Sequence, residues 1–174
     1  MRIKILSVLA AVALLGACET ASTETAKGSG SGASAQQPAT SSETMKAPSG
    51  IMAGSQQDLV VNVGDRVFFD FDKFNVRPDQ QAVLNKQVVW MKANPSVTVT
   101  VEGHCDERGT REYNLALGER RANSVKDYLV AAGVNPERVN TISYGKERPV
   151  ALGSNEEAYS QNRRGVTKVT GAGS

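Results

Sequence analysis

The run GHCDERGTREYNLALGERRA, Gly103 to Ala122, connects a strand pattern to a helix pattern and sets a loop acid ahead of a helical arginine. A helix that begins near Thr110 or Tyr113 places Arg121 in an i, i+4 row whose other members are apolar: Leu117, Val125 and Leu129. The guanidinium fork suits a carboxylate, and Asp106 in the preceding loop suits an ammonium group. The run therefore predicts either a site for a zwitterion or a structural salt bridge between Asp106 and Arg121, and spacing alone favours the salt bridge.

Hydrophobic patterning around this run alternates between strand and helix. Val97, Val99 and Val101 alternate with polar residues, which is typical of a half-buried strand. Pro78 suits a first helical turn, and Gly133 suits a helix C-terminus. The predicted strands cover 66–72, 97–102, 139–144 and 165–170, and the predicted helices cover 78–93 and 113–132. This order predicts a β-α-β-α-β-β domain of the α/β (α+β sandwich) class, with the helices packed on one face of a mixed sheet.

The amino terminus has the outline of a bacterial secretion signal. A short basic region precedes an almost wholly apolar stretch over 5–15, which is shorter than the roughly twenty residues that span a bilayer. Residues 15–18, Leu-Gly-Ala-Cys, match the lipobox, in which signal peptidase cuts before a cysteine that carries a diacylglyceryl group. We expect a signal peptide over 1–17 and lipidation of Cys18; the alternative is an ordinary signal peptide with an incidental cysteine. In lipoproteins of this kind Asp after the cysteine gives inner-membrane retention, so Glu19 favours the outer membrane.

Composition divides the rest of the chain into a tether and a domain. Residues 19–57 are rich in Ser, Thr, Gly, Ala and Gln and contain no aromatic residue, which predicts a flexible linker. We expect the lipidated cysteine and its tether to cover 18–60 and one domain to cover 61–174. A formal net charge of +2 is too small to predict binding to nucleic acid. Once Cys18 is lipidated, Cys105 has no partner for an intramolecular disulfide, so we expect a small buried residue there.

Four ordered motifs resemble the peptidoglycan-associated lipoprotein family, whose soluble part is an OmpA-like domain. They are VFFDFDKFNVRP (67–78), the run 103–122, SYGKERP (143–149) and NRR (162–164), and the resemblance extends from near Val61 to the end of the chain. It implies noncovalent binding of the meso-diaminopimelate side chain of peptidoglycan stem peptides, with Asp106 and Arg121 as the matching acid and arginine. It also implies binding to TolB and other Tol components, and a part in envelope constriction at cell division.

Further candidates for ligand contact lie close to this pair. Phe71 and Asp72 end the first predicted strand, and they reach the same sheet edge as Asp106 if the first two strands run parallel; a core position for Phe71 is the alternative, and the resemblance favours contact. Arg108 and Gly109 lie in a loop that could offer backbone N–H groups to a carboxylate. The predicted ligand-binding set is Asp106, Arg121, Phe71, Asp72, Arg108, Gly109 and Leu117, with Tyr113 and Asn114 as weaker candidates.

The same region gives little support to metal or covalent chemistry. His104 is the single histidine of the chain, and neighbouring strand residues point to opposite faces, so His104, Cys105 and Asp106 do not predict a zinc site. No nucleophile elbow accompanies them, and we expect no catalytic residue, no metal and no cofactor. Arg163 and Arg164 are interpreted as surface charges.

The sequence thus predicts a nonenzymatic lipoprotein of the outer membrane, facing the periplasm, that anchors this membrane to peptidoglycan as part of the Tol-Pal system. Two alternatives stay open. The first is an OmpA-like wall-binding lipoprotein that does not bind TolB. The second is a peptidoglycan-cleaving enzyme with Asp106, Glu107 or Asp72 as paired acids, which would require a defined separation between two carboxylates.

Overall fold

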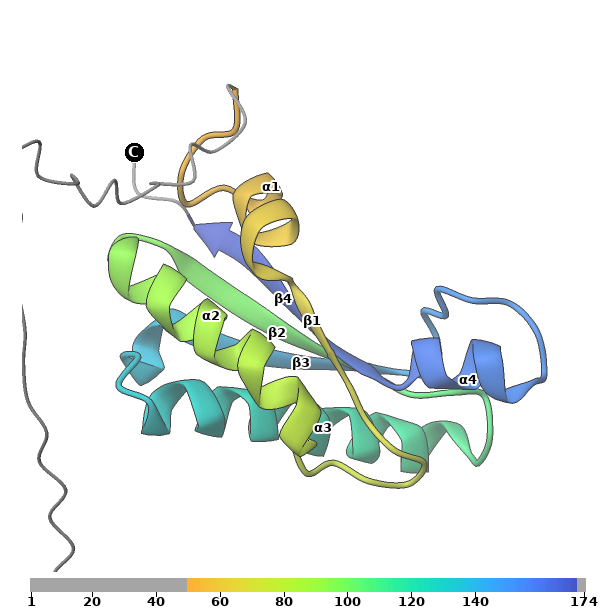
Figure 1. Ribbon diagram of the computed structural model, residues 1–174. Helices are drawn as coiled ribbons and strands as arrows, with labels where there is room; N and C mark the ends of the chain where they lie inside the picture. The colour runs from red at the N-terminus through yellow and green to blue at the C-terminus, as the bar shows by residue number, and fades with distance from the viewer. Residues whose placement is uncertain (1–49, 172–174) are drawn as a thin grey trace, which may run out of the picture. The chain divides into compact units, whose positions relative to one another are not determined.

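The computed structural model of the protein describes residues 50–171; the predicted signal peptide, Cys18 and most of the predicted tether lie outside this range. In the described part, four strands form one mixed sheet in the order β1-β4-β2-β3 (Figure 1): β1 (Arg66–Phe68), β2 (Thr98–His104), β3 (Val139–Gly145) and β4 (Arg164–Gly171). Strand β4 is antiparallel to β1 and β2, whereas β2 and β3 are parallel. Strands β1 and β2 therefore run in the same direction and end at the same edge of the sheet.

Two helices cover one face of this sheet, as predicted. Helix α2 (Gln81–Ala93), which follows the 3-10 turn η2 (Pro78–Gln80), and helix α3 (Arg111–Ala131) lie side by side on it (Figure 1). The valines of the predicted strand alternation point into the interface between helices and sheet. The core joins Leu84, Val88, Met91, Val125 and Leu129 from the helices with Val67, Val97, Val99, Val101 and Val139 from the sheet side. Burial of these apolar surfaces is the main force that holds the two layers together.

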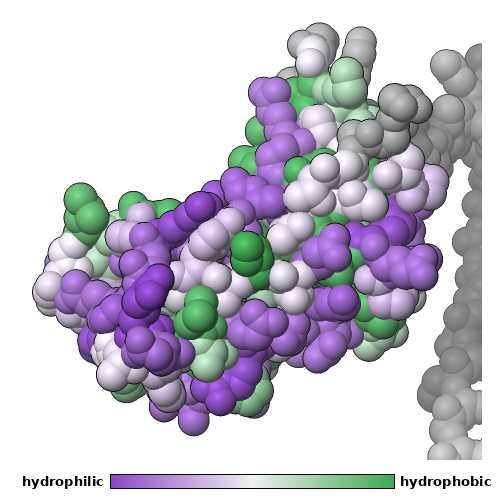
Figure 2. Space-filling model, turned by 180° about the vertical axis from the view of Figure 1, so that it is seen from behind, coloured by the Kyte–Doolittle hydropathy of each residue, from purple (hydrophilic) through white to green (hydrophobic). Residues whose placement is uncertain are grey.

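The opposite face of the sheet is polar. Thr98, Thr100 and Glu102 alternate with the buried valines of β2 and are half-buried, and Figure 2 shows that hydrophilic residues predominate on this side of the molecule. Among residues 50–171, no helix combines the length and the apolar character that crossing a membrane requires.

A short helical segment precedes the sheet, and the hydrophobic pattern gave no sign of it. It comprises α1 (Gln56–Asp58) and the π-helical turn η1 (Leu59–Val63), with Ser55 as the N-cap. Leu59 is fully buried in the core, and the indole Nε1 of Trp90 in α2 donates to Asp58 (2.8 Å). One buried leucine and one polar contact therefore hold this segment, which begins before Val61, against the core. It is too short to show a hydrophobic periodicity in the sequence.

Two other elements differ from their predicted bounds. Strand β1 ends at Phe68, not at residue 72, because Phe69 N donates to Arg163 O (2.9 Å) outside the β1 ladder and Asp72 takes a positive φ of 55°. The seven-residue helix α4 (Glu156–Asn162) was not predicted, since it buries only Ala158 and Asn162 and shows no apolar stripe. The prediction for α3 is confirmed to within two residues; Thr110 caps it by accepting from Tyr113 N (3.2 Å).

Candidate functional site

A pocket of about 200 Å³ lies where β1 and β2 end and α3 begins. The loop after β1 contributes one wall, the loop after β2 contributes another, and α3 forms the floor. The lining residues are Phe71, Asp72, Cys105, Asp106, Arg108, Gly109, Tyr113, Asn114, Leu117 and Arg121. All seven residues of the predicted ligand-binding set are thus brought together, as are the two weaker candidates. Phe71 is 56% exposed, so the alternative of a core position for this ring is wrong.

Arg121 is buried completely, and its guanidinium donates to three backbone oxygens beside the thiol of Cys105. Its row neighbours Leu117, Val125 and Leu129 are also buried, as the periodicity predicts. Nε donates to the carbonyl oxygen of Lys73 (2.9 Å), Nη1 to that of His104 (2.8 Å) and Nη2 to that of Asp70 (3.1 Å). No Asp or Glu oxygen of residues 50–171 lies within 4.0 Å of these nitrogens. Burial without an ion-pair partner lowers the pKa of Arg121.

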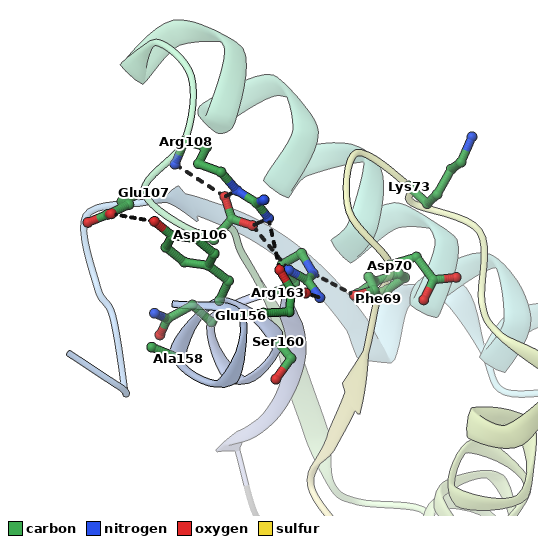
Figure 3. A network of polar contacts seen from close by, with 12 residues as sticks. Phe69, Asp70, Lys73, Asp106, Glu107, Arg108, Glu156, Ala158, Ser160 and Arg163 are labelled. Carbon is green, nitrogen blue, oxygen red and sulfur yellow. Dashed lines mark hydrogen bonds and ion pairs between the residues drawn. The ribbon is translucent and has the colours of Figure 1, made fainter. Parts of the chain in front are cut away.

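Asp106 pairs with two other arginines, so the salt bridge to Arg121 that spacing favoured is absent. Its Oδ2 accepts from Arg108 Nη2 (2.6 Å) and Arg163 Nη1 (3.4 Å), and its Oδ1 accepts from the backbone N–H of Arg108 (3.2 Å) (Figure 3). Burial by itself would raise the pKa of Asp106, but the hydrogen bonds and charge of Arg108 outweigh it and hold this pKa below its usual value. The pocket therefore contains a carboxylate that stays ionised.

The Arg108 side chain lies between two aromatic rings. Its guanidinium carbon is 3.9 Å from the centre of the Phe71 ring and 4.3 Å from that of Tyr159 in α4. This stacking holds Arg108 against Asp106 while about a third of the side chain, 35%, remains exposed. The backbone N–H of Arg108 points at Asp106, so it is not free for a ligand carboxylate as the loop position suggested.

Arg163 and Arg164 are buried, so their interpretation as surface charges is wrong. Arg163 is 6% exposed; its Nε donates to Phe69 O (3.0 Å) and its Nη2 to Glu156 (2.6 Å), which ties β1 and α4 to Asp106 (Figure 3). Arg164 is 4% exposed and donates to backbone oxygens. Arg163 is the C-cap of α4 and Arg164 begins β4, the strand that lies between β1 and β2.

The rest of the lining is fixed by local contacts. Gly109 has a positive φ of 91°, a conformation that favours glycine, and Asn114 donates to the carbonyl oxygen before it, Arg108 O (2.8 Å). Tyr113 at the start of α3 donates its hydroxyl to Asp72. These contacts link the loop after β1 to the start of α3 and close one side of the pocket.

His104 and Cys105 take no part in a reactive cluster. His104 is 2% exposed, lies on the sheet face away from the helices, and stacks on Tyr144 with the ring centres 5.5 Å apart. Cys105 is buried, as predicted, and burial raises the pKa of its thiol to about 11, which disfavours the reactive thiolate. Within residues 50–171, no group of three His, Cys, Asp or Glu side chains could hold a metal ion.

Sequence reasoning missed Arg163, Glu156 and Tyr159 as neighbours of the site. All three come from α4 and its C-terminal end, about fifty positions after Asp106. The NRR motif was the one available signal for Arg163, but no local pattern indicates that a residue so distant reaches the loop after β2.

Comparison with known proteins is consistent with this architecture. Residues 68–163 match the OmpA family, and the chain belongs to that family. It is 59% identical over 121 residues to the peptidoglycan-associated lipoprotein of Rhizobium meliloti (strain 1021), across 70% of this chain and 69% of that protein. It is 49% identical over 112 residues to the protein of the same name from Pasteurella multocida (strain Pm70), across 64% and 74% of the two chains.

Solved structures agree on the fold. The crystal structure of the peptidoglycan-associated lipoprotein from Burkholderia pseudomallei superposes with a TM-score of 0.60 and 42% identity, over 61% of this chain and 90% of that chain. The OmpA-like domain of FopA1 from Francisella tularensis superposes with a TM-score of 0.51 and 25% identity, over 62% and 73%. The predicted OmpA-like mixed α/β fold is therefore confirmed.

Proposed function

We propose that this protein is a lipoprotein that anchors the outer membrane to peptidoglycan without catalysing a reaction, and that its pocket binds the free amino-acid head of meso-diaminopimelate in the stem peptide. Membership of the OmpA family and relatives named peptidoglycan-associated lipoprotein support the wall-binding part of this proposal. The choice of ligand is supported by the charges inside the pocket.

The isolated charge of Arg121 is the observation that carries the ligand assignment. A guanidinium has five N–H groups, and the hydrogen bonds to three backbone oxygens leave two of them for a ligand. An unpaired buried cation is costly to a fold, and a carboxylate that enters the pocket would remove that cost. The head of meso-diaminopimelate offers this carboxylate with an ammonium group on the same carbon, and Asp106 lines the same pocket as Arg121.

Ammonium binding at Asp106 involves an exchange of partners. Arg108 occupies this carboxylate in the unliganded protein, whereas Arg163 approaches it from the buried side. Because one edge of the Arg108 guanidinium is exposed, this side chain can move away from Asp106 and remain stacked between the rings of Phe71 and Tyr159. The ligand ammonium would then replace one cation by another, so Asp106 would never be left unpaired.

Anchoring and partners complete the proposal and rest on sequence and resemblance. Lipidation of Cys18 would attach the protein to the outer membrane with its domain in the periplasm; Cys18 lies outside the described residues. Binding to TolB and other Tol components, and a part in cell division, follow from the family resemblance. If the chain binds the wall but does not bind TolB in a pull-down, the alternative of a wall-binding lipoprotein outside the Tol-Pal system is the correct one.

The pKa values of Asp106 and Glu107 disfavour the alternative of a wall-cleaving enzyme. A glycosidase needs one protonated carboxylic acid, whose pKa is raised. The pKa of Asp106 is lowered, and hydrogen bonds from Ser154 and Tyr159 also lower the pKa of Glu107. We expect purified sacculi to release no soluble muropeptides on incubation with the protein; release above a buffer control would establish the enzyme.

The ligand assignment is tested by titrating the protein with matched stem peptides. We expect a peptide with a free diaminopimelate carboxylate to bind, and the same peptide with that carboxylate amidated to bind at least tenfold more weakly, because a neutral amide leaves Arg121 unpaired. Removal of the glycan should have a much smaller effect. Equal affinities for the free-acid and amidated peptides would mean that Asp106 and Arg121 serve the fold and not the ligand.

A further inference from the structure

An apolar groove lies on the outer side of α2, away from the pocket described above. It has a volume of about 490 Å³ and is lined by Val63, Asn85, Lys86, Val89, Trp90 and Ala93. Val89 is 69% exposed, and Val60 and Val61 of η1, the element that contributes Val63, are 44% and 56% exposed. We call the groove and the exposed valines of η1 the α2 surface. Exposed aliphatic side chains gathered in this way mark a surface that contacts another apolar phase.

Lysines outnumber acids at the α2 surface. Helix α2 carries Lys86 and Lys92 and no acidic residue. One acid lies in the neighbouring turn: Asp58 accepts hydrogen bonds from the neutral groups Trp90 Nε1 (2.8 Å) and Asn62 Nδ2 (2.7 Å), which leave its negative charge in place. Protruding aliphatic residues flanked by lysines fit an anionic phospholipid surface, where the aliphatic groups enter the interface and the lysines meet the headgroups.

The α2 surface and the proposed wall-binding pocket lie at opposite ends of the domain. Val63 lies three positions before β1 begins and Ala93 lies five positions before β2 begins, whereas Phe71 and Asp106 follow these strands. Because β1 and β2 run in the same direction, one feature lies at their starts and the other at their ends (Figure 1). A contact made through the α2 surface would therefore leave the pocket open to a ligand.

Attachment through Cys18, as proposed above, would keep this end close to the membrane. The described structure begins at Gly50, just before α1, so residues 19–49 join the α2 end to Cys18. About thirty residues extend to roughly 110 Å at most, and a chain of such composition averages roughly 30 Å between its ends. Tethering at this range gives an effective concentration of about a millimolar, at which the domain would contact the membrane for much of the time even if its affinity for lipid is weak.

We propose that the α2 surface docks reversibly on the anionic phospholipid surface to which Cys18 is attached, so that the domain rests on the membrane with its pocket turned toward the wall. This inference rests on the proposed lipid anchor. It assigns Val61, Val89 and Lys86 to membrane contact, a role separate from the ligand site.

The test places an environment-sensitive fluorophore at one position of the full lipidated chain, in a Cys105→Ser background. Val89→Cys reports on the α2 surface, and Leu152→Cys is the matched control, because Leu152 is also a protruding aliphatic residue, 90% exposed, in the loop near Glu107 at the pocket end. Each protein is mixed with vesicles of phosphatidylethanolamine and phosphatidylglycerol, and flotation of protein with vesicles is measured first.

We expect both proteins to float and only the label at position 89 to gain intensity, severalfold and with a blue shift. Adding Val61→Glu and Lys86→Glu should remove this gain while flotation remains. Flotation without a change at position 89, or an equal change at both positions, overturns the docking proposal and leaves the anchor standing. A gain that appears without vesicles as protein concentration rises also overturns it in favour of self-association. Failure to float refutes the anchor, and the docking proposal with it.

Discussion

Gly103 in β2 and Gly118 in α3 hold strand and helix in backbone contact: a Cβ on Gly103 would lie 1.9 Å from the carbonyl oxygen of Gly118. The contact lies one helical turn before Arg121, and it brings that guanidinium to within 2.8 Å of His104 O at the end of β2. Two residues without side chains thus set the depth at which the buried arginine sits in the pocket.

Gly103→Ala should be strongly destabilising, because backbone atoms, and not a flexible side chain, occupy the space of the new methyl group. We expect a loss of about 3 kcal/mol or more in the free energy of unfolding, measured by urea denaturation. Gly165→Ala is the control: its Cβ would meet Val125 Cγ2 at 3.3 Å and Phe69 Cε2 at 3.4 Å, contacts that small shifts can relieve. Similar losses for the two variants would mean that the close approach of β2 and α3 is not a constraint.

Asp106→Asn should abolish most cosedimentation with purified sacculi. Loss of one partner from a desolvated charge pair costs about 2 to 5 kcal/mol of binding, enough to remove a modest affinity. Arg121→Lys should also bind poorly, since an ammonium cannot reproduce the two-point fork. Glu107→Gln is the matched control, because this neighbouring acid does not line the pocket. Circular dichroism checks folding, and pelleting of folded Asp106→Asn at the wild-type level would rule out the site.

Arg163→Gln should destabilise the domain and weaken wall binding together. The change leaves Asp106 with fewer partners and removes donors from Phe69 O and Glu156, and breaking a buried pair costs about 3 to 5 kcal/mol. Arg111→Gln is the comparison: Arg111 pairs with Glu147 at 3.2 Å but is 74% exposed, so the expected change is within about 1 kcal/mol. Thermal melts of both variants measure the difference; a mild effect of Arg163→Gln would show that the arginine is replaceable.

Stability should fall as the pH drops below 6.5, because His104 resists protonation in the folded state. Burial lowers the pKa of His104 to about 3, helped by the charges of Arg164, Arg148 and Lys168; Glu102, 3.5 Å away, favours the proton but is outweighed. Below pH 6.5 the histidine binds a proton in the unfolded chain but not in the native state. The free energy of unfolding therefore decreases by about 1.4 kcal/mol for each unit by which the pH is lowered.

The range from pH 6 to pH 5 isolates this histidine, because the carboxyl groups with lowered pKa values lose their contribution only at lower pH. His104→Asn should remove most of the slope in urea unfolding over this range. A proton NMR titration gives the pKa of His104 directly, and titration near 6.5 in the folded protein would contradict the prediction.

Cys18→Ser should give an unprocessed or soluble protein that is missing from outer-membrane fractions, because the lipobox thiol is the proposed attachment point for the lipid. Fractionation after digestion of the wall is the appropriate measurement, since it removes indirect attachment through peptidoglycan. Cys105→Ser, at a buried thiol, is the control and should fractionate normally. Retention of Cys18→Ser in the outer membrane after digestion would place the anchor elsewhere.

Local physics made much of the fold and part of the site predictable from the sequence. The alternation at Val97, Val99 and Val101, the cap at Thr110 and the i, i+4 row through Arg121 depend on residues a few positions apart. The positions of Phe71 and Asp72 beside Asp106 followed from one topological assumption, that β1 and β2 run in the same direction. Segments too short for a period, such as η1 and α4, gave no comparable signal.

Tertiary structure alone decided which charges meet. Spacing paired Asp106 with Arg121, yet Asp106 binds Arg108 and Arg163, the latter 57 positions away, and Arg121 binds backbone oxygens. The reason is the sheet order: β4 lies between β1 and β2, and this carries the end of α4 to the loops that follow both strands. Periodicity reveals which face of an element is buried, but the partner of a buried charge depends on strand order, which no local pattern encodes.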